Sequence, residues 1–252
     1  MINPMSGQPT DSIEVPFPYN LYFTPGGEEA IVVVERLQTV EFRDRETWEL
    51  RGSVYVPSPG VDHMDFTADG EHFVASTEWG GDIVKVDIEA MEIVEAYPAG
   101  GAPVDVKLSP DGSKFYVANQ GEAYNGLHVL DAETLEEIGF IPTGAGAHGL
   151  YPSKDAESLY VANRLGGTIS VVDFETDEVT ETWEVGGSPD MIQLNPEGTE
   201  MWCADRYNDS VSVVSTETGE LIERIPVGSV PHGITYFPNV GDFNLGHNGV
   251  YR

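Results

Sequence analysis

Residues 103–120, PVDVKLSPDGSKFYVANQ, and residues 126–144, GLHVLDAETLEEIGFIPTG, decide the fold of this chain. Together they contain four short runs rich in β-branched and aromatic residues, at 104–108, 115–118, 127–131 and 138–142. Turn sequences separate these runs, including Pro110-Asp111-Gly112, whose Asp and Gly tolerate the backbone of a tight hairpin. The stretch therefore predicts four consecutive antiparallel strands and no helix.

The same pattern recurs along the whole chain. The first apolar residue of each copy follows the previous one by 42 to 44 residues, at Leu21, Met64, Val106, Leu150, Ile192 and Ile234. Four strands at this period are typical of one blade of a β-propeller. We predict an all-β propeller in a single domain over residues 1–252, with five complete four-stranded blades, A to E, at about 17–58, 59–100, 101–144, 145–186 and 187–228.

The two ends of the chain read as parts of further blades. Residues 3–7 match the turn at 215–219, and residues 12–15 then match an outermost strand, whereas residues 231–237 match an innermost strand. We therefore expect partial strands within 1–16 and 229–252. Two interpretations remain: a seven-bladed ancestor that has lost about two blades, or a natural ring of five or six blades. In the first case the open edge of blade A is a surface for oligomer formation.

Several of these motifs are shared with a known family. The strands FYVAN (115–119) and LYVAN (159–163), the turn SPDG (109–112) and the blade endings IPTG (141–144) and IPVG (225–228) resemble the YVTN-repeat β-propellers. GAGAHGLYPS (144–153) and GHNGVYR (246–252) are similar to a secreted, seven-bladed subgroup of that family. The resemblance implies a propeller over essentially the whole chain and export or cell-surface location of full-length relatives. It implies no particular biochemical activity.

The charge of the chain limits its partners. Its 252 residues include 43 acidic and 12 basic side chains, which gives a net charge of −31. Such a surface repels nucleic acid and anionic lipid, because phosphate binding depends on clustered Lys and Arg. It is typical of a halophilic protein, in which concentrated salt screens the self-repulsion. No apolar run is long enough to span a bilayer.

Motifs of common catalytic sites are absent from the sequence. There is no CxxCH, GxSxG, P-loop or HExxH sequence, and the single cysteine, Cys203, stands where other blades carry Ala or Val. We read Cys203 as a small buried apolar residue. No pair of nucleophile and base can be recognised by spacing, so no catalytic residue is predicted.

Polar residues gather at two places in the repeat. Two residues precede the first apolar residue of each innermost strand: Tyr19-Asn20, Asp62-His63, Val104-Asp105, His148-Gly149, Asp190-Met191 and His232-Gly233. The second strand runs back to the same face of the ring and ends at Glu35, Glu78, Gln120, Arg164 and Arg206. The repeat therefore predicts a polar ring at one mouth of the central channel.

This ring contains the candidate site. His63, His148 and His232 are the candidate metal ligands, because imidazole is the commonest ligand of transition metals, and the candidate cofactor is a divalent ion or copper. The candidate ligand-binding residues are Asn20, Asp62, Asp105, Asp190, Arg164 and Arg206. In the alternative interpretation the acidic and histidine side chains cap backbone amides, and the arginines neutralise neighbouring carboxylates.

Two classes of function follow from these observations. The first is a non-enzymatic binding or scaffold propeller, with a protein or small-molecule ligand at the channel mouth. The second is a metal-dependent enzyme or redox protein that uses a His/Asp site in the same place. The lack of a recognisable nucleophile and base favours the first.

Overall fold

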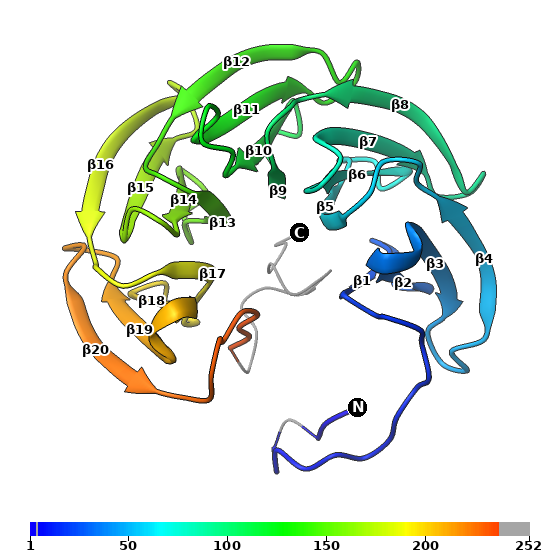
Figure 1. Ribbon diagram of the computed structural model, residues 1–252, viewed down its shortest axis with the longest axis horizontal. Helices are drawn as coiled ribbons and strands as arrows, with labels where there is room; N and C mark the ends of the chain where they lie inside the picture. Colours follow the sequence, from blue (N-terminus) through cyan, green and yellow to red (C-terminus); the bar gives the residue numbers. More distant parts are fainter. Residues whose placement is uncertain (4, 237–252) are drawn as a thin grey trace.

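Strands β1 to β20 form five antiparallel sheets, each built from four strands that follow one another in the chain (Figure 1). The computed structural model describes residues 1–3 and 5–236. The sheets stand around a common centre, with the first strand of each sheet innermost and the fourth outermost. The predicted all-β propeller of four-stranded blades is therefore confirmed.

The strands of the five blades have the following bounds. Blade A contains β1 (Asn20–Phe23), β2 (Glu29–Val34), β3 (Thr39–Asp44) and β4 (Leu50–Tyr55). Blade B contains β5 (Val61–Phe66), β6 (His72–Thr77), β7 (Asp82–Asp87) and β8 (Glu92–Pro98). Blade C contains β9 (Pro103–Leu108), β10 (Lys114–Asn119), β11 (Gly126–Asp131) and β12 (Glu137–Pro142). Blade D contains β13 (Ala147–Pro152), β14 (Ser158–Asn163), β15 (Thr168–Asp173) and β16 (Glu178–Glu184). Blade E contains β17 (Pro189–Leu194), β18 (Glu200–Asp205), β19 (Ser210–Ser215) and β20 (Leu221–Pro226).

Helical structure in the described residues is limited to two single turns of 3-10 helix, η1 (Glu35–Leu37) and η2 (Arg206–Asn208). Each follows the second strand of its blade, at the end of the strand that carries the polar ring. These turns begin at Glu35 and Arg206, two of the polar residues noted in the repeat.

Tight hairpins connect the first and second strands because their turns carry suitable residues. In blade C the Asp111 carboxylate accepts hydrogen bonds from the Ser109 hydroxyl (2.6 Å) and the Ser113 amide (3.0 Å). Gly112 has a φ of +76°, and a Cβ atom there would lie 2.8 Å from the Cβ of Ala68. Glycine is therefore required both by the turn and by the approach of blade B.

Successive blades pack against one another through their first and second strands. After its first residue, each second strand of blades A to D is buried at every position. A strand covered on both faces needs apolar residues throughout, which explains runs such as Ile31–Val34. Between blades A and B, Phe42 and Phe73 meet with ring centroids 6.3 Å apart. Burial of each such side chain contributes about 1.5–3 kcal/mol to folding.

Three of the four lysines fasten one blade to the next. The Lys85 amine donates to the carbonyl oxygens of Ala132 and Glu133, both at 3.0 Å, and so joins blade B to blade C. Lys114 of blade C forms an ion pair of 2.6 Å with Asp177 of blade D. Lys154 of blade D donates to the carbonyl oxygens at 196 (2.9 Å) and 197 (3.3 Å) in blade E. The few amines of this acidic chain thus act between repeats.

The partial strands expected near the two ends are not formed in the described residues. Within 1–3 and 5–16 the pairing is limited to one bridge between Ile2 and Pro9, and residues 229–236 form no strand; Phe237 and the rest of the expected 229–252 segment lie outside the described residues. The reason is that no second strand stands beside these segments. The amides of Val230 and Tyr236 bond instead to side-chain oxygens of Asp209 (2.8 Å) and Gln193 (3.1 Å).

Figure 1 shows where these two segments run. Residues 229–236, drawn in orange-red, lead from β20 toward the centre of the ring, and the blue N-terminal segment runs outside the ring between blades A and E. Met1, Ile13 and Val15 line a cavity together with Leu21 and Val32 of blade A. The N-terminal segment therefore lies against blade A.

In the described residues, no helix has the length and apolar character that crossing a membrane requires.

Candidate functional site

A β-bulge in the innermost strand presents the polar pairs to the channel. The pairing with the second strand shifts register between Val61 and Met64 in blade B, between 147 and 150 in blade D, and between 189 and 192 in blade E. The residues skipped by these shifts include Asp62, His148 and Asp190. A bulge leaves residues unpaired and redirects their side chains. The same irregularity in successive blades thus explains why the pairs meet at one mouth.

Glycine allows two of these bulges to approach each other. A Cβ atom on Gly149 would lie 2.2 Å from the carbonyl oxygen of Asp190 and 3.1 Å from the Cα atom of Met191. No larger residue fits beside the backbone of blade E at this point. Gly149 therefore brings its neighbour His148 close to Asp190.

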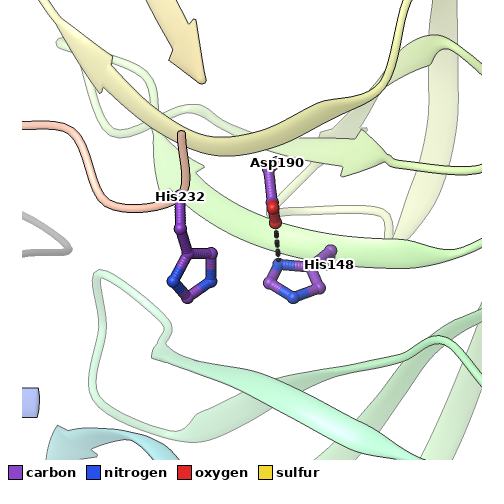
Figure 2. A group of neighbouring side chains, drawn as sticks. All are labelled: His148, Asp190 and His232. Carbon is purple, nitrogen blue, oxygen red and sulfur yellow. Dashed lines mark ion pairs between the residues drawn. The ribbon is translucent and has the colours of Figure 1, made fainter. Parts of the chain in front are cut away.

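His148, Asp190 and His232 form a compact group (Figure 2). His148 belongs to β13, Asp190 to β17, and His232 to the segment that follows blade E. One ligand atom from each side chain lies within 4.8 Å of the others. Nδ1 of His148 is 2.8 Å from Oδ1 of Asp190, and the two imidazole centroids are 5.8 Å apart. Such a spacing allows one metal ion to bind all three groups.

The short contact between His148 and Asp190 is not a well-formed hydrogen bond. Both side chains are buried, and among the described residues neither Nδ1 of His148 nor Oδ1 of Asp190 makes any hydrogen bond. A carboxylate oxygen and an imidazole nitrogen 2.8 Å apart repel each other unless a proton or a cation lies between them. A proton on Nδ1 of His148 or a cation bound by both atoms removes this repulsion, so the contact is compatible with a cation at this point.

The ionisation of the group suits metal binding. Burial acts to raise the pKa of Asp190, but the close contact with His148, with smaller contributions from His232 and Arg164, outweighs it and holds this pKa below its usual range. Burial lowers the pKa of His232 to about 4, against the attraction of Asp190. At neutral pH the site therefore offers an ionised carboxylate and a neutral imidazole, the forms that bind metals.

The third histidine of the ring, His63, lies in the same mouth but turns elsewhere. Its ring centroid is 6.3 Å from that of His148 and 6.2 Å from that of His232. Its Nδ1 accepts a hydrogen bond from the Asn20 amide at 3.0 Å, and its Nε2 is 3.2 Å from Asp62. The contacts of His63 thus bind it to blade A and to its own neighbour, outside the group of three.

The two arginines converge on Asp190. Nη1 of Arg206 donates to Oδ2 of Asp190 at 3.1 Å, and Nη1 of Arg164 lies 3.7 Å from Oδ1. Arg164 also donates to Gln120, whose amide donates to Glu78 at 2.6 Å. A polar chain therefore crosses the mouth, from Glu78 of blade B to Asp190 of blade E.

The opposite side of the mouth is acidic. Burial, followed by the negative charge of Glu78, raises the pKa of Asp62 well above its usual range. The same two causes raise the pKa of Glu35. We call Glu35, Asp62 and Glu78 the acidic side of the mouth, and Arg164 and Arg206 the basic side.

Asp105 has a different role from that of its counterparts. Its two carboxylate oxygens accept hydrogen bonds from the amides of Val106 (2.9 Å) and Leu150 (2.8 Å). Burial raises its pKa to about 6, although the charge of Lys107 acts in the opposite direction. Because both oxygens hold backbone amides, Asp105 joins blade C to blade D and lies outside the group of three.

Two tyrosines at this mouth were not predicted from the sequence. The Tyr22 hydroxyl is 3.4 Å from Nδ1 of His63, and the Arg164 guanidinium lies 6.0 Å from the centroid of the Tyr207 ring. Tyr22 lies in a strand that reads as ordinary apolar sequence, and Tyr207 lies in η2, which the repeat did not predict. Neither carries a signal in the sequence that distinguishes it from a packing residue.

Comparison with known proteins agrees with the fold. Residues 127–240 match the family described as YNCE-like beta-propeller. No protein of curated function matches the chain.

Solved structures of low sequence identity share the architecture. The chain aligns with Kuenenia stuttgartiensis hydrazine synthase at 20% identity and a TM-score of 0.75, over 88% of this chain and 69% of the other. It aligns with the β-propeller domain of Myceliophteria thermophila Cps50 (Swd1) at 13% identity and a TM-score of 0.71, over 86% and 74%. A functionally unknown protein from Desulfotomaculum acetoxidans DSM 771 aligns at 18% identity and a TM-score of 0.68, over 81% and 68%. At these identities the likeness concerns the fold alone.

Proposed function

Because this chain folds as a β-propeller and its residues 127–240 match the YNCE-like beta-propeller family, we propose that it is a binding protein with a divalent transition-metal ion at its channel mouth, held by His148, Asp190 and His232. The propeller fold supports a binding or scaffold role in general terms. The spacing of His148, Asp190 and His232 supports metal binding as the chemistry of that role.

The contact between His148 and Asp190 carries the proposal. The two atoms are 2.8 Å apart, are buried, and make no hydrogen bond in the described part of the chain, and His232 completes a set of three ligand atoms within 4.8 Å. Two imidazoles and one carboxylate are ligands of zinc and of the other late divalent metals, whereas calcium and magnesium prefer oxygen alone. We therefore infer zinc, or copper, as the resident ion.

Three protein ligands leave a fourth position of a tetrahedral ion open. An open position allows a further ligand to bind, and it is also the arrangement that catalytic zinc sites keep. A metal-dependent enzyme or redox protein is therefore the second candidate. The identity of the resident metal separates the two in part, because zinc excludes redox chemistry at the ion whereas copper permits it.

The test is a titration of the purified, chelator-treated protein with ZnCl₂ and, separately, CuCl₂, followed by calorimetry at fixed salt. We expect one equivalent to bind per chain, and the His148→Ala, His232→Ala double variant to lose this binding. His72→Ala is the matched control, because the partly buried His72, 3.7 Å from Asp87, forms with Asp69 and Glu71 another group of described residues whose spacing could hold a metal ion, and the variant removes a ligand of that group alone. Equal binding by the wild type and the double variant would overturn the proposal.

A second readout is thermal stability. An ion that binds only the folded chain at 100 times its Kd stabilises it by about 2.7 kcal/mol. The melting temperature of the wild type and of His72→Ala should therefore rise with zinc, while that of the double variant should follow only the general effect of added cations on the −31 charge.

A further inference from the structure

On the basic side of the mouth, one N–H group of Arg164 has no hydrogen-bond acceptor among the described residues. Nε of Arg164 is buried and makes no hydrogen bond within residues 1–3 and 5–236, and the side chain as a whole is 11% exposed. The other nitrogens of this guanidinium are directed to Gln120 and Asp190. A buried, charged N–H group without an acceptor is destabilising, so this position suits an acceptor from outside the chain.

The balance of charge around Asp190 points in the same direction. The single carboxylate of Asp190 already faces two guanidinium groups, those of Arg164 and Arg206. A divalent ion at the group of three would add two positive charges next to this one carboxylate and the two guanidinium groups. Excess positive charge in a partly desolvated place favours a small anion.

From these observations we propose that the metal-loaded mouth binds a small monocarboxylate, which fills the open position of the ion and accepts a hydrogen bond from Nε of Arg164. This inference rests on the metal site proposed above. A carboxylate has two oxygens in one plane, so one can bind the ion while the other meets the arginine.

The surroundings favour a carboxylate over a phosphate. His148 and Asp190 are 3% and 0% exposed, so a ligand of the bound ion has to be small. Glu35 and Glu78 of the acidic side face the same mouth, and a carboxylate charge there repels a doubly charged anion more strongly than a singly charged one. Glu78 is also linked to Arg164 through Gln120, which keeps the two sides at a defined separation.

The experiment uses acetate as the probe and two metals. Acetate is titrated into the zinc-loaded chain by calorimetry at a fixed chloride concentration, and into the cobalt-loaded chain while the visible absorption of Co²⁺ is recorded. We expect saturable binding with a change in the cobalt spectrum, and no binding to the chelator-treated chain. Inorganic phosphate serves as the competing probe and should bind at least tenfold more weakly than acetate.

Arg164→Gln tests the role of the guanidinium. We expect at least a tenfold loss of acetate affinity; acetate is titrated at zinc saturation and the zinc affinity is measured separately, because Arg164 also forms an ion pair with the metal ligand Asp190. Arg51→Gln is the matched control, because Arg51 forms ion pairs with Asp44 and Glu29 on the outside of blade A and should leave both affinities unchanged. A melting temperature of each variant shows that it is folded.

The outcomes are distinct. Zinc binding without acetate binding would overturn this inference and leave the metal site in place. Equal acetate affinity in Arg164→Gln and the wild type would overturn the role of Arg164, and tighter binding of phosphate would overturn the class of ligand. A chain that binds no zinc would overturn the metal site, and this inference with it.

Discussion

Asp62 and Asp190 occupy the same position of the repeat, two residues before the first apolar residue of blades B and E. They are 1% and 0% exposed, yet their pKa values move in opposite directions. Burial and Glu78 raise the pKa of Asp62, whereas His148 and its positively charged neighbours lower that of Asp190 despite burial. The bulge therefore decides where the side chain points, and the charged neighbours, Glu78 for Asp62 and His148 with the arginines for Asp190, decide how its pKa departs from that of a buried carboxyl without such neighbours.

The largest expected effect comes from removing each charge in turn. Asp190→Asn should lower the free energy of unfolding of the metal-free chain by about 3–5 kcal/mol, because it leaves the guanidinium groups of Arg164 and Arg206 without their buried partner. Asp62→Asn is the matched variant and should leave stability unchanged or raise it, since burial and Glu78 already disfavour that charge. Urea unfolding at fixed salt measures both. Equal losses in the two variants would break the comparison.

A smaller effect is expected from Asp105, the third buried aspartate. Its pKa in the folded chain is raised to about 6, so the folded state binds a proton more tightly than the unfolded state. Stability from this group is fully present below about pH 4, is lost as the pH rises to about 6, and is constant above that. The total change is up to about 3 kcal/mol.

Asp105→Asn removes this titration, so the measurement is the difference in unfolding free energy between wild type and variant at several pH values. This difference should fall from pH 4 to pH 6.5. The amides of Val106 and Leu150 donate to different oxygens of Asp105, and asparagine keeps an acceptor for only one of them, so a constant offset between the two proteins is expected at every pH. A difference that is the same at pH 4 and pH 6.5 would show that the buried carboxyl does not titrate in this range.

The smallest effect concerns the acidic side alone. Glu78→Gln removes the charge that acts on Glu35 and Asp62 but keeps the oxygen that accepts from Gln120. The pKa of Glu35 should therefore fall, and the free energy of unfolding should rise by about 0.5 kcal/mol. Carboxyl NMR titration measures the first quantity. Glu220→Gln, on the exposed turn before β20, is the control and should leave the pKa of Glu35 unchanged.

The repeat predicted the architecture because strands and turns depend on local residues. Short runs such as FYVAN predict a strand, and short sequences such as SPDG predict a turn. The period of the repeat then predicts that the polar residues lie at one mouth. The bulges in the innermost strands were not predicted, because a shift in strand pairing is not marked by any particular residue type. The sequence also could not separate Asp105, whose oxygens hold amides of its own blade and of blade D, from Asp190, which faces side chains of three other segments.

The expected strands near the ends show another limit of sequence reasoning. Residues 231–237 carry the composition of an innermost strand, but a strand exists only beside a partner, and in residues 231–236 the backbone bonds to side chains instead. The same segment nevertheless brings His232 to the group of three. His232 was therefore predicted as a site residue from its place in the repeat, although its backbone does not form the innermost strand that this place implies.

The lysines that join neighbouring blades include one, Lys85, whose chemical modification can report separation of two blades. Lys85 and Lys107 are 9% and 2% exposed, and the amines of Lys85, Lys114 and Lys154 are held across three different blade boundaries. Of these three, Lys85 alone is buried, whereas Lys154 is exposed and the Lys114 side chain is 22% exposed, so an amine-reactive reagent reports separation of blades only at Lys85. The modification rate of Lys85, read by mass spectrometry, would therefore measure how often blades B and C separate while the rest of the chain stays folded.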